Sequence, residues 1–313
     1  MTGDTHVVAL PVSGAGVSPY AVGAVAEVLT HAPGYMLRVC GPDTPITAAG
    51  GVVLRPAYRL DEIAAADTVI VTAVPDPPTD RCPEWADPLR AAATAGARIV
   101  GTGTGVFALA EAGLLDGHRA AVHWPYAPLM RALYPHVLIE PDAIVAASAT
   151  TVTAAGGSCV VDACLYLIST DHGPATATRV ARELLVGGIR AHGQRAYTTP
   201  QPIDPAADPD ITGLLTYLTE HLDRSWTVAA IAAHAGLSRS SLHRRVHHAT
   251  GRAPMEWLTE QRVHAARLLL AETDTPLTTI ATSTGFDSTE SLRHHLRRVT
   301  GLSPAEYRRT FTP

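Results

Sequence analysis

The spacing of apolar residues changes along the chain and divides it into two regions. Up to residue 197, short apolar runs of the buried-strand type alternate with longer stretches of helical period. This alternation predicts an α/β domain, a parallel sheet with helices on both faces. The predicted strands are 6–12, 35–40, 68–74, 97–102 and 143–148. The predicted helices are 18–32, 83–97, 106–115, 159–170 and 174–188.

Beyond residue 211 the pattern is helical throughout, and one segment occurs twice, as 231–257 and 280–307. An internal repeat of this kind indicates a repeated structural unit. Three residues match at an offset of 49, namely Ile231, Ala232 and Gly236 with Ile280, Ala281 and Gly285. After one inserted residue the offset is 50, and Ser238, Leu242, Thr250, Gly251, Pro254 and Trp257 match Ser288, Leu292, Thr300, Gly301, Pro304 and Tyr307.

Each copy has the pattern of a helix-turn-helix. A short helix ends at a glycine, Gly236 or Gly285, the residue that best tolerates a left-handed backbone. An N-cap residue follows, which is Ser238 in the first copy and either Asp287 or Ser288 in the second. The next helix has apolar residues at positions i and i+4 and a polar, basic remainder. A recognition helix needs these two faces, because one packs on the core and the other enters the major groove.

A single long helix is predicted between the copies, over residues 253–272. It offers Trp257, Leu258, Val263, Ala266, Leu269 and Leu270 to the core. Such a helix would fix the separation of the recognition helices, so that they enter successive major-groove segments roughly 34 Å apart.

With this repeat, residues 211–313 resemble the DNA-binding domain of the AraC family of bacterial transcription regulators, most specifically in the stretch GFDSTESLRHHLRRVTGLSPAEYRR. The resemblance implies double-stranded operator DNA as partner, and RNA polymerase as a second partner if the protein is an activator. It also implies two sets of groove-facing or phosphate-contacting residues. These are Arg239, Ser240, His243, Arg244 and Arg245 in the first copy and Ser288, Thr289, Glu290, Arg293, His294 and Arg297 in the second.

The charge distribution agrees with DNA binding by the second region. Residues 1–210 carry 12 arginines against 20 acidic residues, whereas residues 211–313 carry 12 arginines against 9 and are therefore net basic. Phosphate attracts the second region and repels the first. We find no signal-peptide pattern and no apolar run that could span a membrane, so we expect a cytoplasmic protein with no membrane partner.

The four cysteines, Cys40, Cys82, Cys159 and Cys164, have no metal-ligand spacing. They are expected to be small buried hydrophobic residues, and no metal or cofactor is expected. Residues 198–210 hold four prolines and three aspartates and are predicted to be a linker. The predicted domains are thus 1–197 and 211–313.

Residues 97–124 contain a strand that turns directly into a helix ending at Gly113. Its glycines are not spaced as G-x-G-x-x-G, which argues against a dinucleotide site. The segment resembles instead the class I glutamine amidotransferase-like superfamily, in its intracellular protease and deglycase branch. The matching residues are Leu109, Ala110, Ala112, Gly113, Leu114, Leu115, Asp116, Gly117, His123 and Trp124.

The resemblance places the family's nucleophilic cysteine at Gly103, and residues 7–26 contain no acidic partner. Covalent catalysis needs a nucleophile, a base and an orienting group together, so we expect an inactive domain that senses a small molecule or forms a homodimer. Backbone amides at the turn suit a small anion. The predicted pocket comprises Gly103, Thr104, Gly105, His123, Trp124, Gly156, Gly157 and Ser158. Two alternatives stay open: an active hydrolase or deglycase that uses Thr104 or a nearby cysteine, and a domain that serves dimerisation alone.

Overall fold

The computed structural model describes residues 5–14, 16–74, 83–188, 190, 193–198 and 208–311. The chain forms two compact units, Met1–Gln194 and Arg195–Pro313. Most of the predicted linker, residues 199–207, lies outside the described residues, as does Cys82. No helix in the described ranges is long and apolar enough to cross a membrane.

The first unit is built on a seven-stranded sheet of order β10-β11-β7-β6-β1-β2-β5. The strands pair in parallel except at the edge, where β10 runs antiparallel to β11. Their bounds are β1 (His6–Pro11), β2 (Tyr35–Gly41), β5 (Tyr58–Arg59), β6 (Thr68–Val71), β7 (Arg98–Thr102), β10 (Val145–Ala147) and β11 (Thr151–Ala154). Two short sheets pair β3 (Ile46–Thr47) with β4 (Val53–Leu54) and β8 (Arg119–Ala121) with β9 (Leu138–Glu140).

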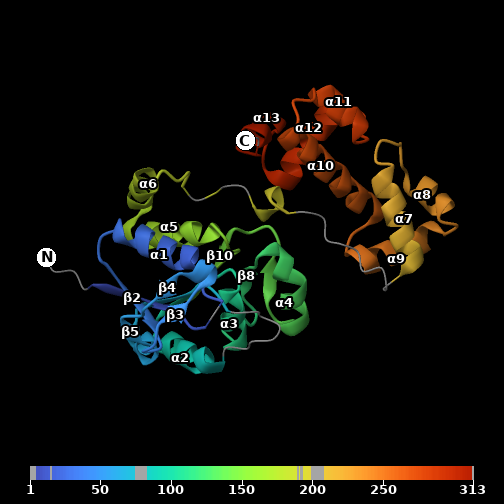
Figure 1. Cartoon of the computed structure of the whole chain (residues 1–313). Coiled ribbons are helices and arrows are strands. Elements are labelled where there is room, and N and C mark those ends of the chain that lie inside the picture. Colours follow the sequence, from blue (N-terminus) through green and yellow to red (C-terminus); the bar gives the residue numbers. More distant parts are fainter. Residues whose placement is uncertain are drawn as a thin grey trace. The chain divides into compact units, whose positions relative to one another are not determined.

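Helices cover the two faces of this sheet (Figure 1). Their buried residues pack with those of the strands in two separate hydrophobic clusters. One cluster includes residues of α1 (Pro19–Thr30), α5 (Cys159–His172) and α6 (Pro174–Glu183). The other includes residues of α2 (Pro83–Thr94), α3 (Gly105–Glu111) and α4 (Ala127–Leu133). The central strands are buried on both faces, which is why they appear in the sequence as continuous apolar runs.

The predicted α/β class is confirmed, with one difference at the edge of the sheet. The segment 143–148 was expected to join a parallel sheet, but β10 is antiparallel and β11, which was not predicted, lies between it and β7. The connection from β10 to β11 is a short hairpin, too short for the crossover that a parallel pair requires.

The second unit is entirely helical in its described regular structure. Its helices are α7 (Pro209–Glu220), α8 (Val228–His234), α9 (Arg239–Thr250), α10 (Pro254–Glu272), α11 (Leu277–Ser283), α12 (Thr289–Thr300) and α13 (Pro304–Phe311). They form two hydrophobic clusters, one for each copy of the repeat. Helix α10 contributes to both, with Trp257 and Leu258 in the first and Val263, Ala266 and Leu270 in the second. One continuous helix therefore joins the two modules.

The turn chemistry that the sequence predicts is present in both copies. Gly236 and Gly285 have positive φ angles of 63° and 78°. The Ser238 and Ser288 hydroxyls each accept a hydrogen bond of 3.1 Å, from the Ser241 and Ser291 amides, so Ser288 rather than Asp287 caps the second recognition helix. These caps set the starts of α9 and α12 and hence which side chains face outward.

Candidate DNA-binding surface and ligand pocket

Helices α9 and α12 bury equivalent positions and expose equivalent positions. Leu242 and Val246 are buried in α9, and Leu292 and Leu296 are buried in α12. The two residues after each of these positions are exposed in both helices. The exposed side chains from the predicted contact set are Arg239, Ser240, His243, Arg244, Ser288, Glu290, Arg293, His294 and Arg297.

Three of these side chains at the start of α12 also interact locally. The Ser288 hydroxyl is the N-cap, and the Arg293 guanidinium lies 3.4 Å from a Glu290 carboxylate oxygen. Because that ion pair is largely exposed, a DNA phosphate or base can replace Glu290 as the partner of Arg293 at little cost in free energy. A cavity of about 380 Å³ opens beside α12, and its lining includes Arg293, His294 and Arg297. Thr289 is half-buried.

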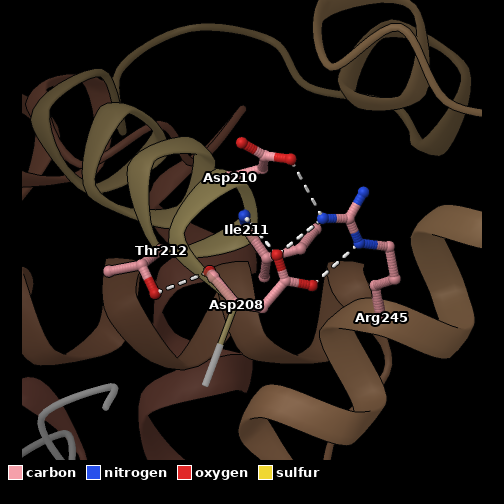
Figure 2. A network of polar contacts seen from close by, with 5 residues as sticks. All are labelled: Asp208, Asp210, Ile211, Thr212 and Arg245. Carbon is pink, nitrogen blue, oxygen red and sulfur yellow. Dashed lines mark hydrogen bonds and ion pairs between the residues drawn. The ribbon is translucent and has the colours of Figure 1, made fainter. Parts of the chain in front are cut away.

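Arg245 differs from the other arginines of α9, because its guanidinium is bound within the domain. Its Nε and Nη2 donate to the two carboxylate oxygens of Asp208 at 2.8 and 2.6 Å, as Figure 2 shows. Nη2 also lies 3.4 Å from an Asp210 carboxylate oxygen. Arg245 was predicted to contact phosphate, but in this structure its hydrogen-bonding edge faces the start of α7.

In the first unit, the predicted turn between β7 and α3 is held by glycines. Gly103 has a φ of +59°, a conformation that favours glycine. A Cβ on Gly105 would lie 2.1 Å from the Val71 carbonyl oxygen, so the start of α3 can approach β6 only without a side chain. The turn therefore places Gly103 at the carboxyl end of β7, where ligand sites of parallel sheets lie.

The structure brings Gly103, Gly156 and His123 together from three segments. A Cβ on Gly156 would lie 2.7 Å from the Gly103 Cα and 3.6 Å from the His123 ring, so the two glycine backbones touch. Gly157 follows at an exposed position, and Trp124 adjoins His123 in the chain. Burial lowers the pKa of His123, and the imidazole is therefore neutral at neutral pH.

Thr104 does not present its hydroxyl to this site. Its Oγ1 accepts a hydrogen bond from the Val74 amide and donates one to the Val74 carbonyl, both at 2.9 Å. Because the backbone of Val74 binds both the hydroxyl proton and a lone pair of Oγ1, the Thr104 hydroxyl links the turn to the segment that follows β6. This argues against Thr104 as a nucleophile.

Cys159, which follows Gly156 by three positions in the sequence, is also held by a hydrogen bond. It starts α5, is buried, and accepts a hydrogen bond from the Arg190 guanidinium at 3.2 Å. The same guanidinium pairs with the buried Asp162 at 2.6 Å. Burial raises the pKa of the Cys159 thiol despite Arg190, so the thiol is protonated and weakly nucleophilic at neutral pH.

Gln194 was not singled out from the sequence, although it holds the segment that carries His123. Its side chain is 3% exposed. It accepts from the Trp124 amide at 3.0 Å and donates to the Val122 and Ala143 carbonyls at 3.0 and 2.8 Å. An isolated glutamine gives no pattern in a sequence, so only the fold could identify this role.

The described cysteines, Cys40, Cys159 and Cys164, are free and buried, as expected. Within the described ranges we find no cluster of His, Cys, Asp and Glu that could hold a metal ion.

Comparison with known proteins places both units. A helix-turn-helix domain family matches residues 231–310. The HTH-type transcriptional regulator ArgR of Pseudomonas aeruginosa is 32% identical over 235 residues, which cover 72% of this chain and 71% of that protein.

Two solved structures share the fold. The AraC family transcriptional regulator from Pseudomonas putida has a TM-score of 0.51 at 19% identity, over 57% of this chain and 99% of that one. Drosophila melanogaster DJ-1beta has a TM-score of 0.51 at 20% identity, over 58% and 99%. The chain belongs to the AraC family of DNA-binding transcriptional regulators and carries an N-terminal domain of the DJ-1 and class I glutamine amidotransferase-like fold.

Proposed function

We propose that the protein reads operator DNA with both recognition helices and that its N-terminal domain senses a small molecule without catalysis. The observation that carries the first half is the shared exposure pattern of α9 and α12 on the two ends of α10. Two equivalent helices on one rigid connector suit two successive major-groove segments on one face of DNA.

Within this proposal, Arg244 and Arg293 read bases, because both are exposed at the middle of their helices and arginine can bond guanine through two atoms. Ser240, His243, Thr289, Glu290 and His294 complete the groove-facing sets. Arg239 and Arg297 contact phosphates, which position the protein without specifying sequence.

Several features of the N-terminal domain support sensing rather than catalysis. The family's nucleophile position is Gly103, the Thr104 hydroxyl is bonded to backbone, and the Cys159 thiol is buried and protonated. Burial lowers the pKa of His123, so its imidazole is neutral at neutral pH. The contacts among Gly103, Gly156 and His123 suit reversible binding of a small molecule beside the turn.

We further propose that the N-terminal domain forms a homodimer and thereby tethers two DNA-binding domains near two half-sites, since tethering raises the effective concentration of the second. The domain limits 1–197, 198–210 and 211–313 fit this arrangement, with α7 starting slightly earlier, at Pro209. The protein acts in the cytoplasm, and RNA polymerase is its further partner if it activates transcription.

The test of this proposal is genome-wide mapping of sites bound by the full chain. We expect discrete sites with a shared two-segment motif, and genes beside them that indicate the chemistry of the effector. Uniform, sequence-independent binding would contradict the proposal. Assays of the full chain on ester, amide and glyoxal substrates test the absence of catalysis, and turnover abolished by Thr104→Ala would overturn it.

A further inference from the structure

Asp208 connects the start of α7 to the middle of the first recognition helix. Its backbone carbonyl and one carboxylate oxygen accept from the Thr212 and Ile211 amides, which makes it the N-cap of α7. Both carboxylate oxygens also receive the Arg245 guanidinium (Figure 2). The Asp208 side chain therefore both caps α7 and accepts hydrogen bonds from Arg245 of α9.

Arg245 lies at the margin of the buried face of α9 rather than on its exposed face. Its side chain is 28% exposed and that of Asp208 is 22% exposed, whereas the neighbouring Arg244 is exposed to solvent. A half-buried arginine that is bound through two nitrogens is fixed in orientation, since the planar guanidinium matches a carboxylate edge.

The second module has no equivalent of this pair. The position that matches Arg245 at the offset of 50 is His295, whose ring packs against Phe286 with centroids 5.7 Å apart. The pair is thus a feature of the first module alone, the module that α7 packs against. Asp208 also lies within the predicted linker 198–210, and it directly follows residues 199–207, which are outside the described ranges.

We propose that Asp208 is a positioning residue for DNA binding: through Arg245 it sets the orientation of α9 relative to α7 and to the end of the linker. Arg245 then acts through α9 and does not contact phosphate. This inference rests on the proposed function, in which α9 reads one segment of the operator.

The experiment compares Asp208→Asn, Arg245→Gln and the double variant in the full chain. Asparagine is as good an N-cap as aspartate, so Asp208→Asn keeps the start of α7 and removes only the charged pairing. The probe is a duplex enriched from a random-sequence library by the wild-type chain. Affinity and protection of each half of the duplex are measured at several salt concentrations. Exposed Asp274→Asn is the matched control for the change in charge.

We expect both single variants to weaken binding about three- to tenfold, the range for a part-exposed, two-point ion pair. The double variant should be no weaker than either single one, and the loss of protection should fall on one half of the duplex. Because Arg245 itself makes no phosphate contact in this proposal, Asp208→Asn and Arg245→Gln should change the salt dependence alike, through the α9 contacts that both variants disturb. Asp274→Asn should bind as well as the wild type or slightly better.

The opposite result is equally clear. If Arg245 contacts phosphate, Asp208→Asn frees it and removes a negative charge, so binding stays equal or tightens. Arg245→Gln alone then weakens binding and lowers the salt slope by about one. That pattern, or additive losses in the double variant, overturns the inference. If the wild-type chain enriches no sequence, the proposed function itself fails before the variants are compared.

Discussion

Restoring a cysteine at Gly103 tests the interpretation of the N-terminal domain. The turn has room for a Cβ, which would meet the Thr72 carbonyl oxygen at 3.5 Å and the Gly156 Cα at 3.6 Å, ordinary contact distances. The cost is the positive φ of +59°, about 1–2 kcal/mol for a residue other than glycine. For a unit of this size, that lowers the melting temperature by about 2–8 °C.

Gly156→Ala is the matched control at the other side of the same contact. Its Cβ would lie 2.7 Å from the Gly103 Cα, at a φ of +118°. Real Cβ atoms essentially never approach so closely, and a shift of backbone is required. We expect a clearly larger fall in melting temperature than for Gly103→Cys, measured by thermal denaturation of the full chain. Equal falls would show that the two glycine backbones do not touch as described.

Activity is then measured for Gly103→Cys on ester, amide and glyoxal substrates. We expect no efficient turnover, because a thiol alone lacks a base with an orienting carboxylate. Residues 7–26 contain no acidic residue that could orient such a base. Substantial turnover would refute this reasoning and show that the remaining catalytic machinery is intact.

Three further predictions concern the Gln194 hydrogen bonds, the pair of Asp208 with Arg245 and the two-domain architecture. Gln194→Leu should lower the free energy of unfolding of the N-terminal unit by about 2–4 kcal/mol, because it leaves the Trp124 amide and two backbone carbonyls without their partner. A loss below about 0.5 kcal/mol in a denaturant titration would show that these hydrogen bonds are not made. The Arg245 hydrogen bond, with the Ile211 amide and the charge of His248, holds the pKa of Asp208 below its usual range. A lowered folded-state pKa contributes stability that is fully present above the unfolded pKa, about 3.9, and is lost as the pH falls through the folded pKa. The stability advantage of the wild type over Asp208→Asn should therefore begin to shrink below about pH 4 and be gone below the folded pKa of Asp208. An advantage that is undiminished at about pH 2 would exclude the charged pairing as its source. Asp210, which also faces Arg245, is tested alongside as Asp210→Asn. Removal of residues 1–197 should leave a folded fragment that binds operator DNA more weakly than the full chain, because the fragment is no longer tethered to a second copy. Equal affinities of fragment and full chain, together with a monomeric full chain in light scattering, would contradict the proposed dimer.

The sequence predicts the architecture where local pattern and packing agree. The repeat predicts both helix-turn-helix modules, down to Ser238 as N-cap and the buried pairs Leu242 with Val246 and Leu292 with Leu296. These features depend on residues close together in the chain, which periodicity and capping rules describe well.

The structure also shows features that depend on contacts between residues far apart in the sequence. The sequence did not predict β11, because its residues Thr151–Ala154 alternate threonine with apolar residues and form no continuous apolar run. Asp208 before Pro209 is a recognisable helix start, but its partner Arg245 is 37 positions away. Gln194 lies 72 positions from Val122. Periodicity within a single sequence carries no signal for such pairs.

The most direct test of the central claim is a footprint of the full chain on its enriched duplex at single-nucleotide resolution. We expect two protected segments on one face of the DNA, about one helical turn apart. Arg244→Ala should remove protection and sequence preference at one segment, and Arg293→Ala at the other, at about 1–3 kcal/mol each. A single protected segment, or two variants with wild-type footprints, would contradict the claim that α9 and α12 both read the operator.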